Sequence, residues 1–187
     1  MDYNLKQVED YLTNIYGMHL GENKTISKKL MKQLNRKNLI ARSARCVYLV
    51  DNLIIKTSSD STFGKLPFGA EQCINEFNLY HSKDSSVNPF KKILCPVYAI
   101  YKSNFIYLTI HKPVVPLAKN DDCPDTIYSH IEKDSSFSNI NLFLSILDEF
   151  KEKLVFNSPA IQYEFSKLST FGYDENRELC ILDYGIY

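Results

Sequence analysis

Two side chains of opposite charge have a spacing in the sequence that suits the binding of phosphate groups. Lys56 closes the apolar run 53–55, and Glu76 follows 20 residues later on one flank of an expected helix. A buried lysine whose ammonium is paired with that carboxylate would hold a fixed positive charge suited to phosphate. The alternative is a solvent-exposed lysine at a strand end, which is the commoner fate of such residues.

A second candidate position lies near the C-terminal end of the sequence. Asp183 closes the apolar run 179–182 and precedes Tyr184 and Gly185. A carboxylate there would project from the lip of a sheet, where it can hold Mg²⁺. The alternative is an aspartate in an ordinary turn before glycine.

A third feature is a run of basic residues without a single acid between them. Its members are Lys24, Lys28, Lys29, Lys32, Arg36, Lys37, Arg42 and Arg45. One interpretation is a solvated helix face. The other is a patch that binds phosphates or acidic groups.

The elements that must position these residues follow from hydrophobic periodicity. Apolar side chains at three- and four-residue steps predict helices over 3–16, 27–38, 70–82 and 139–155. Short apolar runs predict strands at 39–41, 46–50, 53–56, 95–101, 105–111, 171–173 and 179–182. Asp51 and Asn52 form a two-residue turn, so the strands on either side of it form a hairpin. Residues 57–69 form a loop, and 112–124, with three prolines, are excluded from regular structure. This order of elements predicts an α+β chain in two lobes.

Composition excludes several classes of protein. The 187 residues are 44% hydrophobic and 24% charged, which is typical of a globular chain. Basic and acidic residues number 22 each, and this balance disfavours a protein that binds nucleic acid over its whole surface. No apolar run is long enough for a membrane helix, and the first residues lack the apolar core of a signal peptide.

The cysteines and histidines indicate no metal or redox site. The five cysteines are odd in number and at least 22 positions apart, so the sequence has no CxxC pair. We therefore expect a reduced, cytoplasmic compartment. The four histidines share no spacing that predicts a site, and each is expected to be exposed or satisfied by neighbours. The abundance of Lys, Asn, Ile, Tyr and Ser is typical of an AT-rich genome, which suggests a viral or microbial source, and for a viral protein the cytoplasm would be that of the host.

Taken together, these segments resemble the protein-kinase family. In that family a strand lysine pairs with a helix glutamate and holds nucleotide phosphates, and the aspartate of an Asp-Phe-Gly motif binds Mg²⁺. The resemblance gives these roles to Lys56, Glu76 and Asp183, with Tyr184 in place of phenylalanine. The stretch 172–185 is its most specific part and is especially similar to small kinase-like proteins of viruses and bacteria.

The resemblance also implies an architecture. It implies a protein-kinase-like two-lobe fold with an antiparallel N-lobe sheet, one helix in that lobe and an abbreviated helical C-lobe. Residues 39–117 correspond to the N-lobe, with the hinge at 112–117, and residues 118–187 to a truncated C-lobe that ends at Asp-Tyr-Gly. Residues 1–38 precede both as a basic helical extension. Because the sequence ends two residues after Gly185, we expect no activation segment.

The family's catalytic loop is altered at each position that does chemistry. By the family's spacing back from Asp183, the metal-binding asparagine is replaced by Thr170 and the catalytic base by Phe165, and Tyr163 takes the place of the preceding histidine. Phenylalanine cannot accept a proton. Glu164 would serve as a displaced base only after a one-residue shift, which the fixed spacing disfavours.

The glycine-rich loop is altered too. Its three glycines correspond to Ile40, Arg42 and Arg45, and without glycine a backbone cannot approach phosphates closely. Arg42 and Arg45 would either reach phosphate with their side chains or block the pocket.

Three functions follow as hypotheses. The first is a catalytically impaired, pseudokinase-like protein that binds or regulates a protein partner. Under this hypothesis we expect a hetero- or homo-oligomer. No cofactor is required, and if a nucleotide binds, the ligands are ATP and Mg²⁺. The second is an active atypical ATP-dependent serine/threonine protein kinase, since phosphoryl transfer depends mainly on positioning and electrostatics. The third makes the basic run the binding site, for nucleic acid or for an acidic partner.

Overall fold

In the computed structural model the chain forms two compact units. The described residues are 5–20, 25–58, 68–103, 106–118, 127–132, 134–155, 163 and 165–185. The first unit comprises Met1–Asn78 and Pro96–Pro113, and the second comprises Leu79–Cys95 and Val114–Tyr187. Helices and antiparallel strands both contribute, so the predicted α+β class is confirmed. Within the described part of the chain, no helix is long and apolar enough to cross a membrane.

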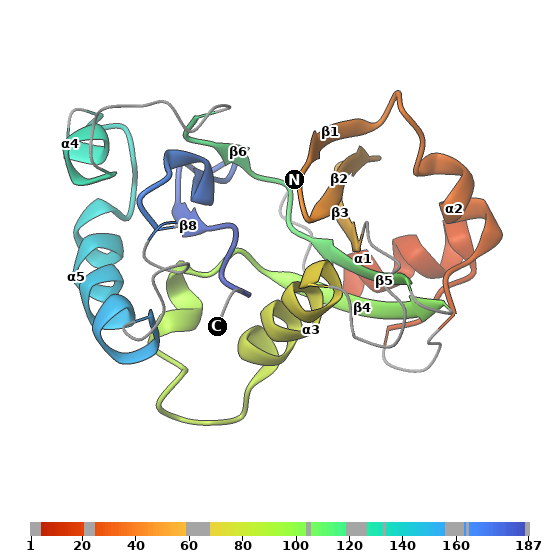
Figure 1. Cartoon of the computed structure of the whole chain (residues 1–187), viewed down its shortest axis with the longest axis horizontal. Helices are drawn as coiled ribbons and strands as arrows, with labels where there is room; N and C mark the ends of the chain where they lie inside the picture. The colour runs from red at the N-terminus through yellow and green to blue at the C-terminus, as the bar shows by residue number, and fades with distance from the viewer. Residues whose placement is uncertain are drawn as a thin grey trace. The chain divides into compact units, whose positions relative to one another are not determined.

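A five-stranded antiparallel sheet forms the centre of the first unit (Figure 1). Its strands, in spatial order, are β1 (Leu39–Arg42), β2 (Arg45–Val50), β3 (Leu53–Ser58), β5 (Ile106–His111) and β4 (Val97–Ser103). The predicted hairpin between β2 and β3 is confirmed. Asp51 and Asn52 have φ values of 48° and 65°, the left-handed conformations that a tight hairpin turn requires.

The N-terminal helices share an apolar core with this sheet. They are α1 (Leu5–Tyr11), a π-helical turn η1 (Leu12–Tyr16) and α2 (Lys28–Gln33). Val8, Leu12 and Leu30 are completely buried and join a cluster that includes Val50 and Ile55 of the sheet. Residues 5–20 and 25–34 therefore contribute to the core on one face of the sheet.

Local hydrogen bonds explain where these helices begin and end. Gly17, at φ 64°, ends the first helical segment as expected. The hydroxyl of Ser27 accepts a hydrogen bond from the amide of Leu30 and so caps α2. The helix predicted for 27–38 ends early, at Gln33, because the side chain of Asn35 accepts a bond from the amide of Lys37 and closes a turn.

The opposite face of the sheet is polar where α3 (Phe68–His81) meets it. Val47 lies opposite Lys56, and Lys56 lies opposite Thr109, so these three side chains share one face. The helix predicted for 70–82 begins two residues earlier and ends one residue earlier. Residues 59–67, most of the loop predicted before it, lie outside the described residues.

The second unit combines short helices with a three-stranded antiparallel sheet. Its elements are η2 (Phe90–Ile93), β6 (Val115–Pro116), α4 (Ile127–Glu132), α5 (Ile140–Phe150), η3 (Lys151–Val155), η4 (Leu168–Thr170), β7 (Phe171–Tyr173) and β8 (Leu179–Ile181), and the sheet order is β6-β7-β8. The helix predicted for 139–155 is found as α5 and η3. The predicted C-terminal hairpin is also confirmed, and the carboxylate of Asp174 accepts bonds from the amides of Asn176 and Glu178 in its turn.

One expectation for this unit is wrong. The proline-rich stretch 112–124 was expected to lack regular structure, but Val115 and Pro116 form strand β6 and pair with Tyr173 and Gly172. Pro116 is tolerated because β6 lies at the edge of its sheet. A Cβ atom on Gly172 would lie 2.6 Å from the carbonyl oxygen of Val115, so the absence of a side chain there permits the pairing.

Candidate functional site

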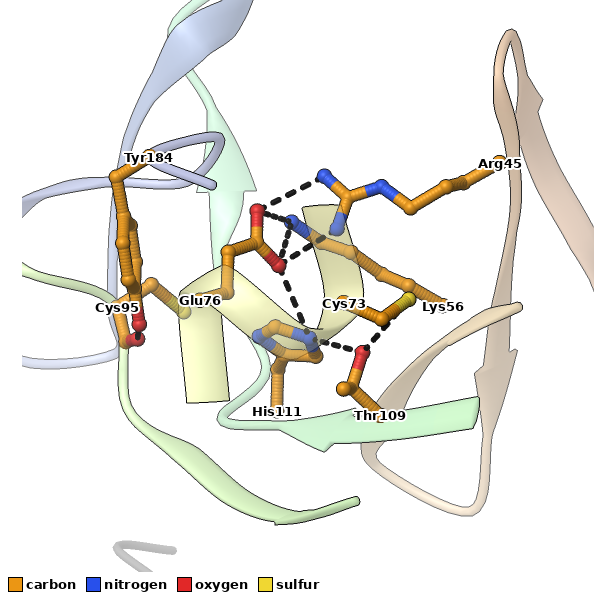
Figure 2. A network of polar contacts seen from close by, with 8 residues as sticks. All are labelled: Arg45, Lys56, Cys73, Glu76, Cys95, Thr109, His111 and Tyr184. Carbon is orange, nitrogen blue, oxygen red and sulfur yellow. Dashed lines mark hydrogen bonds and ion pairs between the residues drawn. The ribbon is translucent and has the colours of Figure 1, made fainter. Parts of the chain in front are cut away.

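A fully buried carboxylate, that of Glu76 on α3, is the centre of a cluster of charged side chains in the first unit (Figure 2). The guanidinium of Arg45 donates two hydrogen bonds to it, Nη1 to Oε2 at 2.6 Å and Nη2 to Oε1 at 2.8 Å. Arg45 is itself only 4% exposed. A bidentate pair of this kind is the strongest common contact between an arginine and a carboxylate.

Lys56 reaches the same carboxylate at longer range. Its Nζ atom lies 3.3 Å from Oε1 and 3.5 Å from Oε2 of Glu76, and its side chain is almost completely buried. The predicted Lys56–Glu76 pair therefore exists, and the expectation of an exposed lysine is wrong. The shorter bonds to Glu76 nevertheless come from Arg45.

A histidine and a threonine of β5 complete the cluster. His111 Nε2 lies 3.6 Å from Oε2 of Glu76 and 2.8 Å from the hydroxyl oxygen of Thr109. The Thr109 hydroxyl lies 3.7 Å from the sulfur of Cys73 on α3. Figure 2 shows these side chains converging from β2, β3, β5 and α3.

Strand register explains why these residues meet. Side chains two residues apart on a strand point to the same face, so Arg45 shares a face with Val47, and Val47 lies directly opposite Lys56. On α3, Cys73 and Glu76 are three residues apart and therefore also share a face. Strand register thus places Arg45, Lys56 and Thr109 on one face of the sheet, and the packing of α3 brings Glu76 to them.

The turn that carries Arg45 is packed closely against the beginning of α3. A Cβ atom on Gly69 would lie 2.3 Å from the carbonyl oxygen of Ala44 and 3.1 Å from Cγ of Arg45. Only glycine allows this approach. The β1–β2 turn is thus held against the helix at the point where the guanidinium enters the cluster.

Burial and charge act in opposite directions on the pKa of Glu76. Burial alone would raise it, but the positive charges of Arg45 and then Lys56, with their hydrogen bonds, bring the pKa below its ordinary value. Burial likewise raises the pKa of the Cys73 thiol. Glu76 is therefore ionised at neutral pH, and the cluster contains two fixed positive charges and one negative charge.

This pKa shift predicts how stability depends on pH. A carboxylate whose pKa is lower in the folded state stabilises the fold above its unfolded pKa of about 4.3, and the contribution is lost as the pH falls through the folded pKa. We expect the difference in free energy of unfolding between the wild type and Glu76→Gln to be largest at pH 6–7. In that range the difference should not change with pH. The difference should shrink below about pH 4.3, in urea titrations at several pH values. A difference that grew on acidification would contradict the ionised assignment.

The remaining candidate residues of the first unit lie outside this cluster. Arg42, at the end of β1, is exposed, whereas Arg45 is buried. Of the four residues expected at a nucleotide site, the structure brings together Arg45, Lys56 and Glu76. Arg42 joins the exposed basic residues of α2 and the turn that follows it.

In the second unit, Phe165 and Thr170 are core residues. The ring of Phe165 stacks on Phe150 at a centroid distance of 5.7 Å and meets Phe171 edge-on at 5.8 Å. Thr170 is 1% exposed, and its carbonyl accepts a bond from the amide of Leu182. Tyr163 is exposed, and Glu164 lies outside the described residues.

Asp183 also belongs to the second unit, where it is half-buried. The next residue, Tyr184, is buried, and its hydroxyl donates a 2.7 Å hydrogen bond to the carbonyl of Cys95 (Figure 2). Tyr184 thus anchors the end of the described chain to the segment that precedes β4. Across the described ranges, no three His, Cys, Asp or Glu side chains gather closely enough to hold a metal ion.

Two members of the cluster were not identified from the sequence. His111 was expected only to be satisfied or exposed, and Thr109 was not singled out. Strand alternation contains the signal that would have found them, because 109 and 111 share the face of β5 that lies opposite Lys56 and Ile54. The bond from Arg45 to Glu76 required knowledge of how α3 packs on the sheet.

Comparisons with known proteins complete the description of the site. No family model and no curated protein matches the chain. Among solved structures, the chain is similar to the pseudokinase domain of BIR2, an immune regulator of the RLK/Pelle family, with 15% identity, a TM-score of 0.47, and coverage of 96% of this chain and 57% of that one. The chain thus spans little more than half the length of that domain. At this identity the likeness transfers no residue roles.

Proposed function

We propose that this chain is a kinase-like protein that has lost phosphoryl transfer and acts by binding a protein partner. The observation that carries the proposal is the bidentate bond from buried Arg45 to Glu76. In an active kinase the helix glutamate holds the strand lysine toward the nucleotide phosphates. Here both carboxylate oxygens accept short bonds from a guanidinium, and the lysine lies further away.

The position of Arg45 adds to this argument. It corresponds to the third glycine of the phosphate-covering loop, where a bare backbone would approach the phosphates. The residue instead directs a large buried side chain into the cluster, on a turn packed against Gly69. These residues do not fit a nucleotide phosphate at Lys56 unless the Arg45–Glu76 pair opens.

The second unit supports the same proposal. A catalytic base must be able to take a proton from a substrate hydroxyl, and Phe165 cannot do so. Its ring packs against Phe150 and Phe171. A small rotation of this side chain therefore brings no proton-accepting group to the position. The retained Lys56–Glu76 pair then has a structural role, joining α3 to the sheet.

A thermal-shift measurement with Mg·ATP tests the proposal. A ligand at 100 times its Kd stabilises a protein by about 2.7 kcal/mol, which raises the Tm of a chain of this size by about 5–11 °C. We expect millimolar Mg·ATP to leave the Tm unchanged in both the wild type and Asp183→Ala. A rise of this size in the wild type that is absent from Asp183→Ala would show that nucleotide binds, and it would contradict the exclusion of nucleotide phosphate by the Arg45–Glu76 pair on which the proposal rests.

A further inference from the structure

Strand β1 is an exposed edge of the five-stranded sheet. It pairs with β2 on one side, and no other described strand pairs with it on the other side. Three of its four residues are exposed, and Ile40 is 55% exposed. Leu49 on the neighbouring strand is a second exposed apolar residue, at 44%. An edge of this kind presents backbone N–H and C=O groups that can pair with another strand.

Six exposed basic side chains in the described part of the chain lie on α2, on the turn that follows it and on β1 itself. They are Lys28, Lys29, Lys32, Arg36, Lys37 and Arg42. We call β1 together with these six residues the basic edge. Within the described ranges none of the six forms an ion pair, and Lys29 contacts the ring of Tyr16 at 5.9 Å from its centroid. Exposed basic side chains of this kind attract an acidic partner.

The chemistry of the basic edge favours a protein over a nucleic acid. Proteins that bind single strands stack bases on aromatic side chains, and residues 25–45 contain no Phe, Tyr, Trp or His. The eight bases at 24–45 are balanced by acids elsewhere in the sequence, because the whole chain has no net charge, and this balance disfavours binding of a long polyanion. An exposed strand edge, in contrast, recognises the backbone of an extended peptide.

We propose that the basic edge binds an extended acidic segment of a protein partner, which adds to β1 as a further strand. Main-chain hydrogen bonds to β1 would supply affinity, and acidic side chains beside Lys37 and Arg42 would set the preference for sequence. The exposed apolar side chain of Ile40 on β1 suits an apolar residue at the neighbouring position of that segment. The inference shares one premise with the proposed function, namely that the partner is a protein.

The test uses the full chain and labelled eight-residue peptides followed by fluorescence anisotropy. The probe alternates Glu and Val. One control peptide alternates Lys and Val, and another is the probe with every second amide N-methylated, which removes hydrogen-bond donors along one edge. The test variant is Lys37→Glu/Arg42→Glu, and the matched control is Lys6→Glu/Lys83→Glu, which reverses two exposed charges that do not belong to the basic edge.

We expect the Glu/Val probe to bind and both control peptides to fail. The Lys37→Glu/Arg42→Glu variant should weaken binding of the probe about tenfold or more at low salt, whereas the control variant should change it less than about twofold. Equal binding of the N-methylated peptide would overturn strand addition. Binding of duplex DNA without binding of the probe, or binding of neither, would overturn the proposal. Stabilisation by Mg·ATP would contradict only the exclusion of nucleotide by the Arg45–Glu76 pair, and phosphate transfer would contradict only the loss of catalysis, so failure of the proposed function is distinguishable from failure of this inference.

Discussion

Replacing Glu76 with alanine should lower the free energy of unfolding by about 3–5 kcal/mol. The substitution leaves the guanidinium of Arg45 and the ammonium of Lys56 buried without the anion that both contact. Removing one partner of a buried ion pair is costly because the remaining charge keeps its desolvation penalty. Urea denaturation at pH 7, followed by far-UV circular dichroism, measures the loss.

Two variants separate charge imbalance from lost packing. Arg45→Met keeps Glu76 paired with Lys56, so we expect it to cost less than Glu76→Ala. The triple variant Arg45→Met/Lys56→Met/Glu76→Leu removes all three charges, and we expect it to recover much of the lost stability, because apolar replacements of whole buried ion clusters are often neutral. A Glu76→Ala protein within about 1 kcal/mol of the wild type would show that the cluster is not held as described.

Replacing Phe165 should have an effect of similar size in the second unit. Phe165→Ala removes a ring that is 6% exposed and contacts two other rings, and such substitutions typically cost about 3–5 kcal/mol. Phe165→Asp should cost more because it buries a carboxylate among aromatic rings. Near-UV circular dichroism during urea denaturation reports on this aromatic packing.

Matched substitutions make this prediction specific to burial. Phe165→Leu keeps an apolar side chain and should cost less than Phe165→Ala. Tyr163→Ala alters an exposed aromatic residue two positions away and should stay within about 0.5 kcal/mol of the wild type. If Phe165→Asp were as stable as the wild type and gained phosphoryl transfer, the position would be a degenerate catalytic site and not part of a core.

Local sequence signals were sufficient for much of the fold. The turn residues Asp51 and Asn52 and the alternating strands beside them predicted the β2–β3 hairpin, because tight turns need residues that accept positive φ. Strand β6 was missed because its two residues form a strand only through pairing with Gly172 and Tyr173, more than 50 positions away. The short helix α4 was also missed. Helices of so few residues depend on tertiary packing more than on local propensity.

The candidate site was only partly predictable for a related reason. The 20-residue spacing predicted that Lys56 and Glu76 would pair, and the structure places them together. The same reasoning assigned Arg45 to a phosphate loop, where its side chain would either reach phosphate or block the pocket, and did not predict that it points to Glu76. That direction follows from the β2–β3 register and from the approach of Gly69 to Ala44, both of which are tertiary properties.

Transfer of the γ-phosphate from ATP tests the proposed function most directly. Purified protein is incubated with γ-labelled Mg·ATP and a mixture of serine- and threonine-containing peptides, beside a sample of Asp183→Ala. We predict that incorporation of label into the peptides and into the protein itself is the same in both samples and does not exceed the background without protein. Transfer at an ordinary kinase rate, about 1–100 per second, that Asp183→Ala abolishes would contradict the loss of catalysis.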